Sequence, residues 1–301
     1  MMTRRVLLLL FSLGCVAGCA SAPVNAPSPS PAPEGTSEPV GPVAGNNKSR
    51  RVWRITPTVE VASYQSTLKT TTAERDTPGS RQNSVTTTTN YSLKLVKASN
   101  SVRISGNVSA FQIKSDEVAQ SLSSNLFVLP FGFDGMILDH NISLHLSSPN
   151  QLASLTQCND SSQTILSIIN RDLIVVPQEL VTDQIWQDST SSSLCSGSLP
   201  VVVSVIRNYR ITGETIINGV PALKIERTEK LVTSGEGSQG QHQITINGTG
   251  TGKAQVYIDQ ISGLLLSLDG TTQIELSIKS SGRIQHFSQT SEEKVTPTSS
   301  P

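Results

Sequence analysis

The sequence is poor in aromatic and charged residues, and neither sign of charge is in excess. Aromatic residues make up 4% of the 301 residues and charged residues 15%, with 23 basic and 23 acidic side chains. Nucleic-acid-binding proteins need a basic surface that neutralises phosphates, so this balance gives no reason to expect a nucleic-acid partner. Much of the polarity comes from Ser, Thr, Asn and Gln, whereas exposed helices are typically rich in Glu and Lys. The composition therefore favours strands, turns and loops.

Recognisable catalytic and metal-binding motifs are also missing. The sequence contains neither a G-x-S-x-G nucleophile elbow nor an H-E-x-x-H zinc motif. The run GTGTG at 248–252 lies between β-patterned segments without a following helix, which does not suit a phosphate cradle. His140 and His145 would point to opposite faces of a strand, which disfavours a shared metal. We therefore expect no catalytic residues, metal or cofactor, and keep a hydrolase without a known motif as an alternative.

A long apolar run occurs only at the N-terminus. Residues 1–18 have a basic start, an apolar core at 6–13 and small residues after it, which is typical of a secretory signal peptide. The core is shorter than the about 20 residues that a spanning helix needs. It ends in VAGC at 16–19, which resembles the bacterial lipobox. We expect cleavage before Cys19 and acylation of Cys19. The alternative is an ordinary signal peptide cut within GCASA, which would remove Cys19.

Acylation would give the chain its first partner, the lipid bilayer. Several acyl chains on one cysteine attach a protein stably, because each buried CH₂ contributes about 0.8 kcal/mol. We therefore expect a location in the bacterial cell envelope, facing the periplasm or the exterior. Ala20 stands where Asp would signal retention in the inner membrane, so an outer membrane is expected if the organism has one. Residues 19–51 lack aromatic residues and are rich in Pro, Ala and Ser, which predicts a disordered tether.

From residue 52 to residue 289 the dominant pattern is alternation of apolar and polar residues. In TQIELSI at 272–278, three aliphatic residues share one face and polar residues share the other. Such alternation is typical of an antiparallel sheet with one packed face and one hydrated face. We predict a single mainly β domain over 52–289, built as a curved antiparallel sheet or half-barrel. Residues 290–301 are expected to form a disordered tail.

Turn signals divide this pattern, and its middle part differs. Runs of Gly, Asp, Asn and Ser predict turns at 217–219, 259–263 and 268–270 and a flexible hairpin tip at 234–240. The segment 116–199 is mixed, with two short helices expected between 149 and 172. The first would begin near a Ser-Pro pair, and the second would carry Ile165, Ile168 and Ile169 on one face. Trp53 and Trp186 have apolar neighbours and are predicted to pack in the core.

Two cysteines remain outside the export segment. Cys158 and Cys195 would meet an oxidising compartment after export, which predicts one disulfide between them. Closing the loop from 158 to 195 would stabilise the fold by about 4 kcal/mol. The alternative is a pair of reduced, buried thiols. A redox or metal site is not expected, because neither cysteine belongs to a C-x-x-C pair.

Two segments resemble a known group of envelope proteins. GETIINGVPALKI at 213–225 and QVYIDQISGLLLSLDG at 255–270 resemble LolA-like half-barrels. Members of that group are curved sheets around an apolar cavity, with short helices as a lid. IWQDSTSSSLC, which contains Trp186 and Cys195, is also similar to uncharacterised bacterial lipoproteins.

The half-barrel resemblance implies an apolar ligand. The lid would then include Ile165, Ile168 and Ile169, and LFVLPFGF at 126–133 would form a wall or mouth with Phe127, Phe131 and Phe133. The alternative is that this run is a core strand and turn. We therefore predict an envelope lipoprotein without enzymatic activity that binds an apolar envelope molecule. The competing hypothesis is a structural or interaction module of the envelope. Its protein partner is unknown from the sequence.

Overall fold

Strands make up most of the folded chain. The computed structural model describes residues 51–56, 61–76, 82–98, 101–116, 122–123, 129–138, 141–147, 161–196, 199–239 and 242–298. The helix among them is α2 (Ser161–Asp172). The main sheet contains β2 (Val61–Glu74), β3 (Gln82–Ala98), β4 (Ser101–Ser115), β5 (Leu122–Ser123), β6 (Phe131–Leu138), β7 (Asn141–Leu146), β9 (Ile185–Ser196), β10 (Leu199–Ile217), β11 (Val220–Gln239), β12 (His242–Asp259), β13 (Leu265–Ser280) and β14 (Arg283–Pro297).

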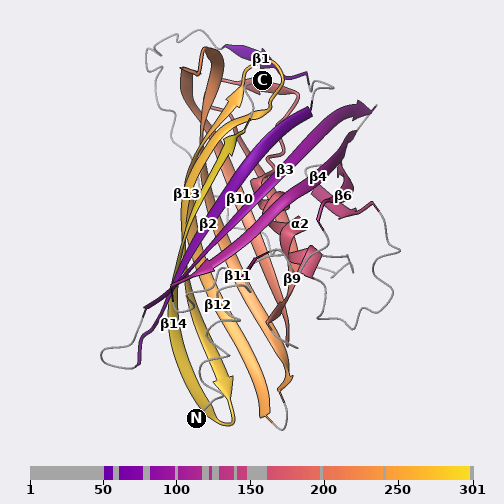
Figure 1. The fold of residues 1–301 in the computed structure, drawn as a ribbon. Coiled ribbons are helices and arrows are strands. Elements are labelled where there is room, and N and C mark those ends of the chain that lie inside the picture. The colour runs from indigo at the N-terminus through magenta and orange to yellow at the C-terminus, as the bar shows by residue number, and fades with distance from the viewer. Residues whose placement is uncertain are drawn as a thin grey trace, which may run out of the picture.

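These 12 strands form one antiparallel sheet that curls into a nearly closed barrel (Figure 1). The strand order is β7-β6-β4-β3-β2-β14-β13-β12-β11-β10-β9, and β5 pairs with β4 outside this path. The two edge strands, β7 and β9, approach each other, and α2 contacts both of them. The helix therefore lies at the seam of the barrel. This architecture confirms the predicted curved antiparallel sheet.

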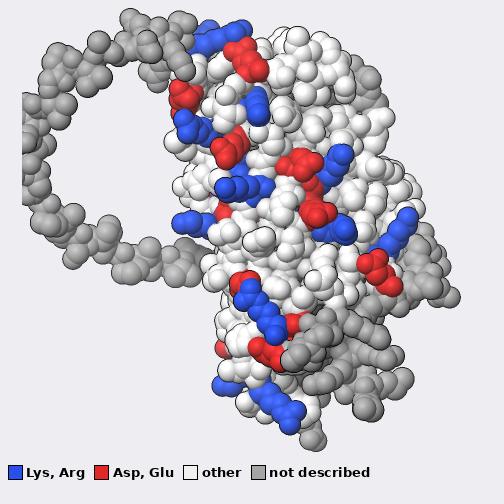
Figure 2. Space-filling view, turned by 90° about the vertical axis from the view of Figure 1, so that its left-hand side faces the viewer, with Lys and Arg blue, Asp and Glu red and all other residues white. Residues whose placement is uncertain are grey.

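Alternation along the strands separates the two faces of the sheet. On the inner face, aliphatic side chains of β11 to β14 stand side by side and are fully buried: Ile225, Val256, Leu268 and Val295. At the adjacent position of each strand, the outer face carries Glu226, Gln255, Asp269 and Lys294. Side chains of both charges are scattered over the outer surface in Figure 2. At these positions the convex face is polar, whereas Val202, Ile206 and Val232 of β10 and β11 are exposed aliphatic residues.

The helix among the described residues, α2, is not long and apolar enough to cross a bilayer.

A two-stranded ribbon lies across one end of the barrel, at the top of Figure 1. It pairs β1 (Val52–Arg54) with β8 (Glu179–Val181). The chain after β1 is fixed by two backbone hydrogen bonds, from Ile55 N to Gln178 O at 2.8 Å and from Thr56 N to Ile261 O at 2.7 Å. The first described residues are thus attached to the turn that joins β12 and β13.

The C-terminal end departs from expectation. The prediction of a disordered tail from residue 290 is wrong, because β14 continues to Pro297. This strand lies between β13 and β2, and Glu293 and Val295 in it are buried. The run TSEEKVTP is rich in polar residues. Those that point inward form hydrogen bonds with polar side chains inside the barrel, as Ser291 does with Thr70 and Glu293 with Arg227.

Two of the predicted turns are confirmed. Asn218 (φ 50°) and Gly219 (φ 85°) join β10 to β11, and Gly263 (φ 72°) lies in the turn from β12 to β13. The predicted turn at 268–270 is wrong, because β13 runs straight through it. Gly270 instead allows close approach, since a Cβ there would lie 2.8 Å from the Cβ of Ala254. Residues 234–239 belong to β11 rather than to a flexible tip.

The helix and core predictions have mixed outcomes. α2 confirms the second predicted helix, and both tryptophans are buried as expected. The first predicted helix, from residue 149, lies outside the described residues.

Candidate functional site

Seven charged side chains meet inside the barrel, and we call them the interior charge cluster. Apart from one half-buried arginine on α2, each is at most 6% exposed. Burying an ion is costly unless it is paired and hydrogen-bonded. The cluster is the most chemically distinctive feature of the described interior, and its members are Arg171 and Asp172 of α2, Asp188 of β9, Arg207 of β10, Arg227 and Glu229 of β11, and Glu293 of β14.

Glu293 is the centre of one half of the cluster. Its carboxylate accepts a hydrogen bond from Arg227 Nη2 at 2.6 Å and another from Arg171 Nε at 2.8 Å. Arg227 Nη2 also lies 3.5 Å from Glu229 Oε2. Two guanidinium groups from different elements thus converge on one carboxylate, which attaches α2 to the β11–β14 wall.

Asp188 organises the other half. Arg207 Nε donates to Asp188 Oδ1 at 2.6 Å, and the Tyr209 hydroxyl donates to Asp188 Oδ2 at 2.9 Å. Trp186 stacks on Tyr209 with ring centroids 5.2 Å apart. Arg207 Nη1 donates to the backbone carbonyl of Arg171 at 3.0 Å, which connects the two halves. The C-terminal end of α2 is therefore bonded to both β10 and β14.

Small residues make room for the longest of these contacts. Arg227 on β11 reaches Glu293 on β14 across two intervening strands, and the residues in register between them are Ala254 and Gly270. A Cβ on Gly270 would lie 2.8 Å from the Cβ of Ala254, so the two small residues allow this close packing between the strands that separate Arg227 from Glu293.

The environment separates the protonation states of the two neighbouring carboxyl groups. Burial would raise the pKa of Glu293, but the positive charges of Arg171 and Arg227 outweigh it and lower the pKa to about 2. Burial raises the pKa of Asp172 well above its ordinary value, and the negative charge of Glu293 raises it further. Asp172 is therefore protonated, whereas Glu293 is ionised. The Tyr91 hydroxyl donates a hydrogen bond to Asp172 Oδ2 at 3.1 Å.

This arrangement balances the cluster electrically. Ion pairs join the three guanidinium groups of the cluster to the carboxyl groups of Glu293, Asp188 and Glu229, and none of these pairs includes Asp172. An ionised Asp172 would leave one negative charge in excess in a buried environment. The protonated acid is thus the state that the surrounding charges favour.

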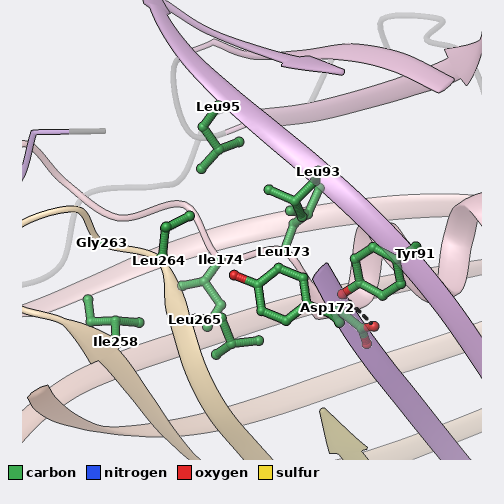
Figure 3. A pocket seen from close by; sticks show the side chains of 11 residues that line it. Tyr91, Leu93, Leu95, Asp172, Leu173, Ile174, Ile258, Gly263, Leu264 and Leu265 are labelled. Atoms are coloured by element: carbon green, nitrogen blue, oxygen red, sulfur yellow. Dashed lines mark hydrogen bonds between the residues drawn. The ribbon is translucent and has the colours of Figure 1, made fainter. Parts of the chain in front are cut away.

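A small cavity borders the cluster at Asp172 (Figure 3). It has a volume of about 30 Å³ and is lined by Tyr64, Tyr91, Asp172 and aliphatic side chains of β3, β12, β13 and the segment after α2. A water molecule needs about 10–15 Å³ by this measure, whereas an apolar cavity that binds benzene measures about 150 Å³. The cavity is therefore of a size for water and too small for an acyl chain.

The structure places the predicted lid and wall residues in the hydrophobic core. Ile165, Ile168 and Ile169 are buried on α2, and Phe133 is buried in β6. Phe131 is half-buried beside them, whereas Phe127 lies outside the described residues. None of the described ones lines the cavity at Asp172. The structure thus brings the isoleucines and Phe133 together in one core, as the alternative interpretation of a core strand expects.

The predicted cysteine sites are beyond what the structure tests. Cys19 and Cys158 lie outside the described residues. Cys195 belongs to β9, opposite Pro200 of β10. Acylation of Cys19 and the disulfide between Cys158 and Cys195 therefore stay predictions.

Histidine and metal chemistry gain no site from the described residues. His145 lies in β7, His140 is outside the described part, and no group of three His, Cys, Asp or Glu placed to hold a metal occurs within it. His242 Nδ1 and Ser281 Oγ lie 2.6 Å apart, but both are exposed at hairpin ends and neither lines the cavity. A nucleophile and base need an orienting group and a substrate position, so this contact alone does not define a catalytic pair.

The interior charge cluster is the feature that sequence reasoning missed, although a signal was present. Arg227 and Glu229 stand at the positions between Ile225 and Leu231 where alternation expects aliphatic residues. Arg207 has the same phase as the buried Tyr209. Charged residues in the inward phase of several strands could have indicated a buried ionic network.

Comparisons with known proteins provide little further information. No protein-family model matches the chain, and no curated protein matches it. An exported protein with a YmcC-like fold from Bacteroides fragilis is 8% identical, with 79% of this chain and 97% of that chain covered and a TM-score of 0.22. The β domain of the Bordetella autotransporter BrkA is 6% identical, with 78% and 98% covered and a TM-score of 0.23. OmpT, an outer membrane protein of Vibrio cholerae, is 8% identical, with 78% and 99% covered and a TM-score of 0.22. TM-scores this low carry no conclusion for this chain.

Proposed function

We propose that this protein is a lipoprotein of the bacterial cell envelope, anchored through acylated Cys19. The proposal rests on the basic and apolar leader, the VAGC sequence and the Pro-rich residues that follow. The described fold begins at the ribbon strand β1, directly after those residues, which is where a tethered domain would start. The polar convex face of the sheet suits a domain held in water beside a membrane.

We further propose that the anchored barrel works as a non-catalytic structural or interaction module. One observation supports this proposal: side chains of α2 and of the interior charge cluster are buried inside the described part of the barrel. The cavity beside them has a volume of about 30 Å³. Such an interior favours a rigid body over a container. The ionic contacts between α2, β10 and β14 would keep the barrel in one shape.

Binding of an apolar envelope molecule remains the second candidate. It is favoured by the resemblance to half-barrel carriers and by the apolar face of α2 at the seam between β7 and β9. A ligand of this kind would have to displace side chains that are now packed together. At the described core around α2, the carrier proposal thus requires a rearrangement of side chains, whereas the module proposal does not.

The anchor is tested by intact-mass analysis of the full-length chain made in a bacterial host. We expect a chain that begins at Cys19 and carries acyl groups, and a Cys19→Ser variant without them. A wild-type chain without acyl groups, cut beyond Cys19, would refute the anchor.

Organic extraction of the same purified protein, followed by lipid mass spectrometry, separates the two candidate functions. The control is the unfolded protein taken through the same purification. The folded protein should carry no more non-covalent lipid than this control. A stoichiometric native lipid would replace the module with the carrier as the leading function.

A further inference from the structure

We propose that the barrel rests on the bilayer through the end at which the chain enters from its anchor. The contact surface is formed by three exposed aliphatic side chains, which we call the tether-end patch: Val52, Ile216 and Ile261, exposed by 53%, 69% and 69%. This inference rests on the proposed acylation of Cys19, and it adds the orientation of the domain. Its partner is a phospholipid bilayer surface.

Polar contacts hold the three segments of the patch together. Glu214, two residues before Ile216 on β10, accepts hydrogen bonds from Arg51 Nη1 at 2.8 Å and from Gln260 Nε2 at 3.2 Å. Each of these donors is the residue directly before a patch member.

Backbone contacts fix the same arrangement independently. Ile261 O accepts from the amide of Thr56, just beyond β1, at 2.7 Å. Gln260 N donates to the carbonyl of Pro221, which stands opposite Ile216 in the β10–β11 hairpin. The ribbon strand β1, the β10–β11 turn and the β12–β13 turn all lie at the upper end of the barrel in Figure 1. The patch is therefore a fixed surface at one end of the molecule.

The position of the anchor explains why a bilayer would cover this patch. In the anchored protein, residues 19–50 lie between the acylated cysteine and Arg51, so the tether leads into the fold at this end. Single exposed aliphatic residues are ordinary on protein surfaces. Three of them beside the point where a membrane-bound tether enters are favourably placed, because the tether keeps the bilayer at a high effective concentration.

Three exposed arginines near the patch are paired with acidic residues of the protein. Arg51 pairs with Glu214 at 2.8 Å. Two further exposed arginines of this region pair in the same way, Arg54 with Glu179 at 3.3 Å and Arg210 with Asp183 at 3.7 Å. Because acidic partners neutralise these three described arginines, their attraction to anionic headgroups is weak. We therefore expect apolar contact to drive docking of the patch, with labelling that depends on neither anionic lipid nor salt.

The full-length acylated protein in phosphatidylcholine vesicles provides the test. The vesicles contain a phosphatidylcholine with a photoactivatable group on its acyl chain, and labelled peptides are mapped by mass spectrometry. We expect labels on the peptides that contain Ile216 and Ile261. Replacing both residues by Ser should lower this labelling several-fold without changing flotation of the protein with the vesicles.

Ile284 provides the matched control. It is 55% exposed on β14, next to the β13–β14 turn, at the opposite end of the barrel in Figure 1. Ile284→Ser should leave labelling at the patch unchanged, and circular dichroism confirms that all variants fold.

Two results would overturn the inference while leaving the anchor intact. The first is flotation with labels at the Ile284 end or with no labels on the domain. The second is labelling of the patch that disappears in high salt or requires anionic lipid. A wild-type protein that fails to float would refute both the anchor and the docking.

Discussion

At the residue scale, the neighbours of Asp172 and Glu293 decide which of these two buried carboxyl groups carries a charge. Glu293 has two arginine partners, whereas Asp172 faces Glu293 and the Tyr91 hydroxyl. Asp172→Asn keeps a neutral, similarly shaped acceptor for Tyr91, so we expect a loss of at most about 1 kcal/mol in the free energy of unfolding. Glu293→Gln leaves Arg171 and Arg227 without their shared carboxylate and should cost about 3–5 kcal/mol. Urea unfolding at pH 7 measures both, and equal losses would contradict this assignment.

The same residue gives the stability a specific dependence on pH. The folded pKa of Asp172 lies well above its ordinary value of 3.8, so its contribution is complete below that value and is lost as pH rises towards the folded pKa. The loss reaches about 1.4 kcal/mol per pH unit. Asp172→Asn cannot ionise, so its stability relative to wild type should increase from pH 4 to pH 8. Parallel curves for the two proteins in urea titrations would rule out a buried, protonated Asp172.

Glu293 predicts the opposite slope at acidic pH. Its folded pKa of about 2 lies below its ordinary value of 4.5, so its contribution is complete above pH 4.5 and is lost as pH falls towards 2. Wild type should therefore lose more stability than Glu293→Gln between pH 5 and pH 2. Urea midpoints of the two proteins over this range test the prediction, and a constant difference would contradict it.

At the scale of one element, the glycines of β12 determine how closely its neighbours pack. Gly248, Gly250 and Gly252 alternate along the strand and point into the barrel, where side chains of β11 and β13 fill the space above them. A Cβ on Gly250 would lie 2.5 Å from the carbonyl oxygen of Gln273 and 3.0 Å from the side chain of Leu231. Close packing against β11 and β13 thus explains the glycines of the GTGTG run.

Gly250→Ala should therefore destabilise the protein by about 1–3 kcal/mol, since backbone must move to admit the methyl group. Gly213 provides the control, because nothing lies within 4 Å of a Cβ built there and its φ is not positive. Gly213→Ala should leave the stability unchanged or raise it by about 0.4–1 kcal/mol. Thermal and urea unfolding of both variants test the pair. A Gly250→Ala variant with unchanged stability would show that the backbone of β12 and β13 can move at little cost in free energy.

The elements also show what could be predicted from the sequence. Alternation identified the β domain, and apolar residues at helical spacing identified the second predicted helix, which the structure places at 161–172; both signals depend on local periodicity. Asp269-Gly270 was misread as a hairpin because its close contact with Ala254 comes from a strand that only the fold brings alongside. Arg227 and Glu293 were missed for the same reason: their pairing joins residues far apart in the sequence. Local patterns therefore predicted the sheet but not the charges inside it.

At the scale of the whole molecule, the last strand connects the beginning of the chain to its end. β14 pairs with β13 on one side and with β2 on the other. No other strand pair among the described residues joins the N-terminal strands β2–β7 to the C-terminal strands β9–β13 within the sheet. Closure of the seam by α2 also depends on β14, because Arg171 is bonded to Glu293.

Removing residues 290–301 should therefore unfold the protein, although the composition of this segment is that of a tail. The truncation takes away Glu293, Val295 and most of the β14–β2 ladder, which would leave Arg171 and Arg227 without their carboxylate and two strand edges open. A chain ending at Thr298 keeps every described strand and is the matched control. We expect the shorter chain to lose cooperative urea unfolding and resistance to proteolysis, while the control retains both. A chain ending at residue 289 that unfolds as cooperatively as the control would mean that the two halves of the sheet hold together without β14.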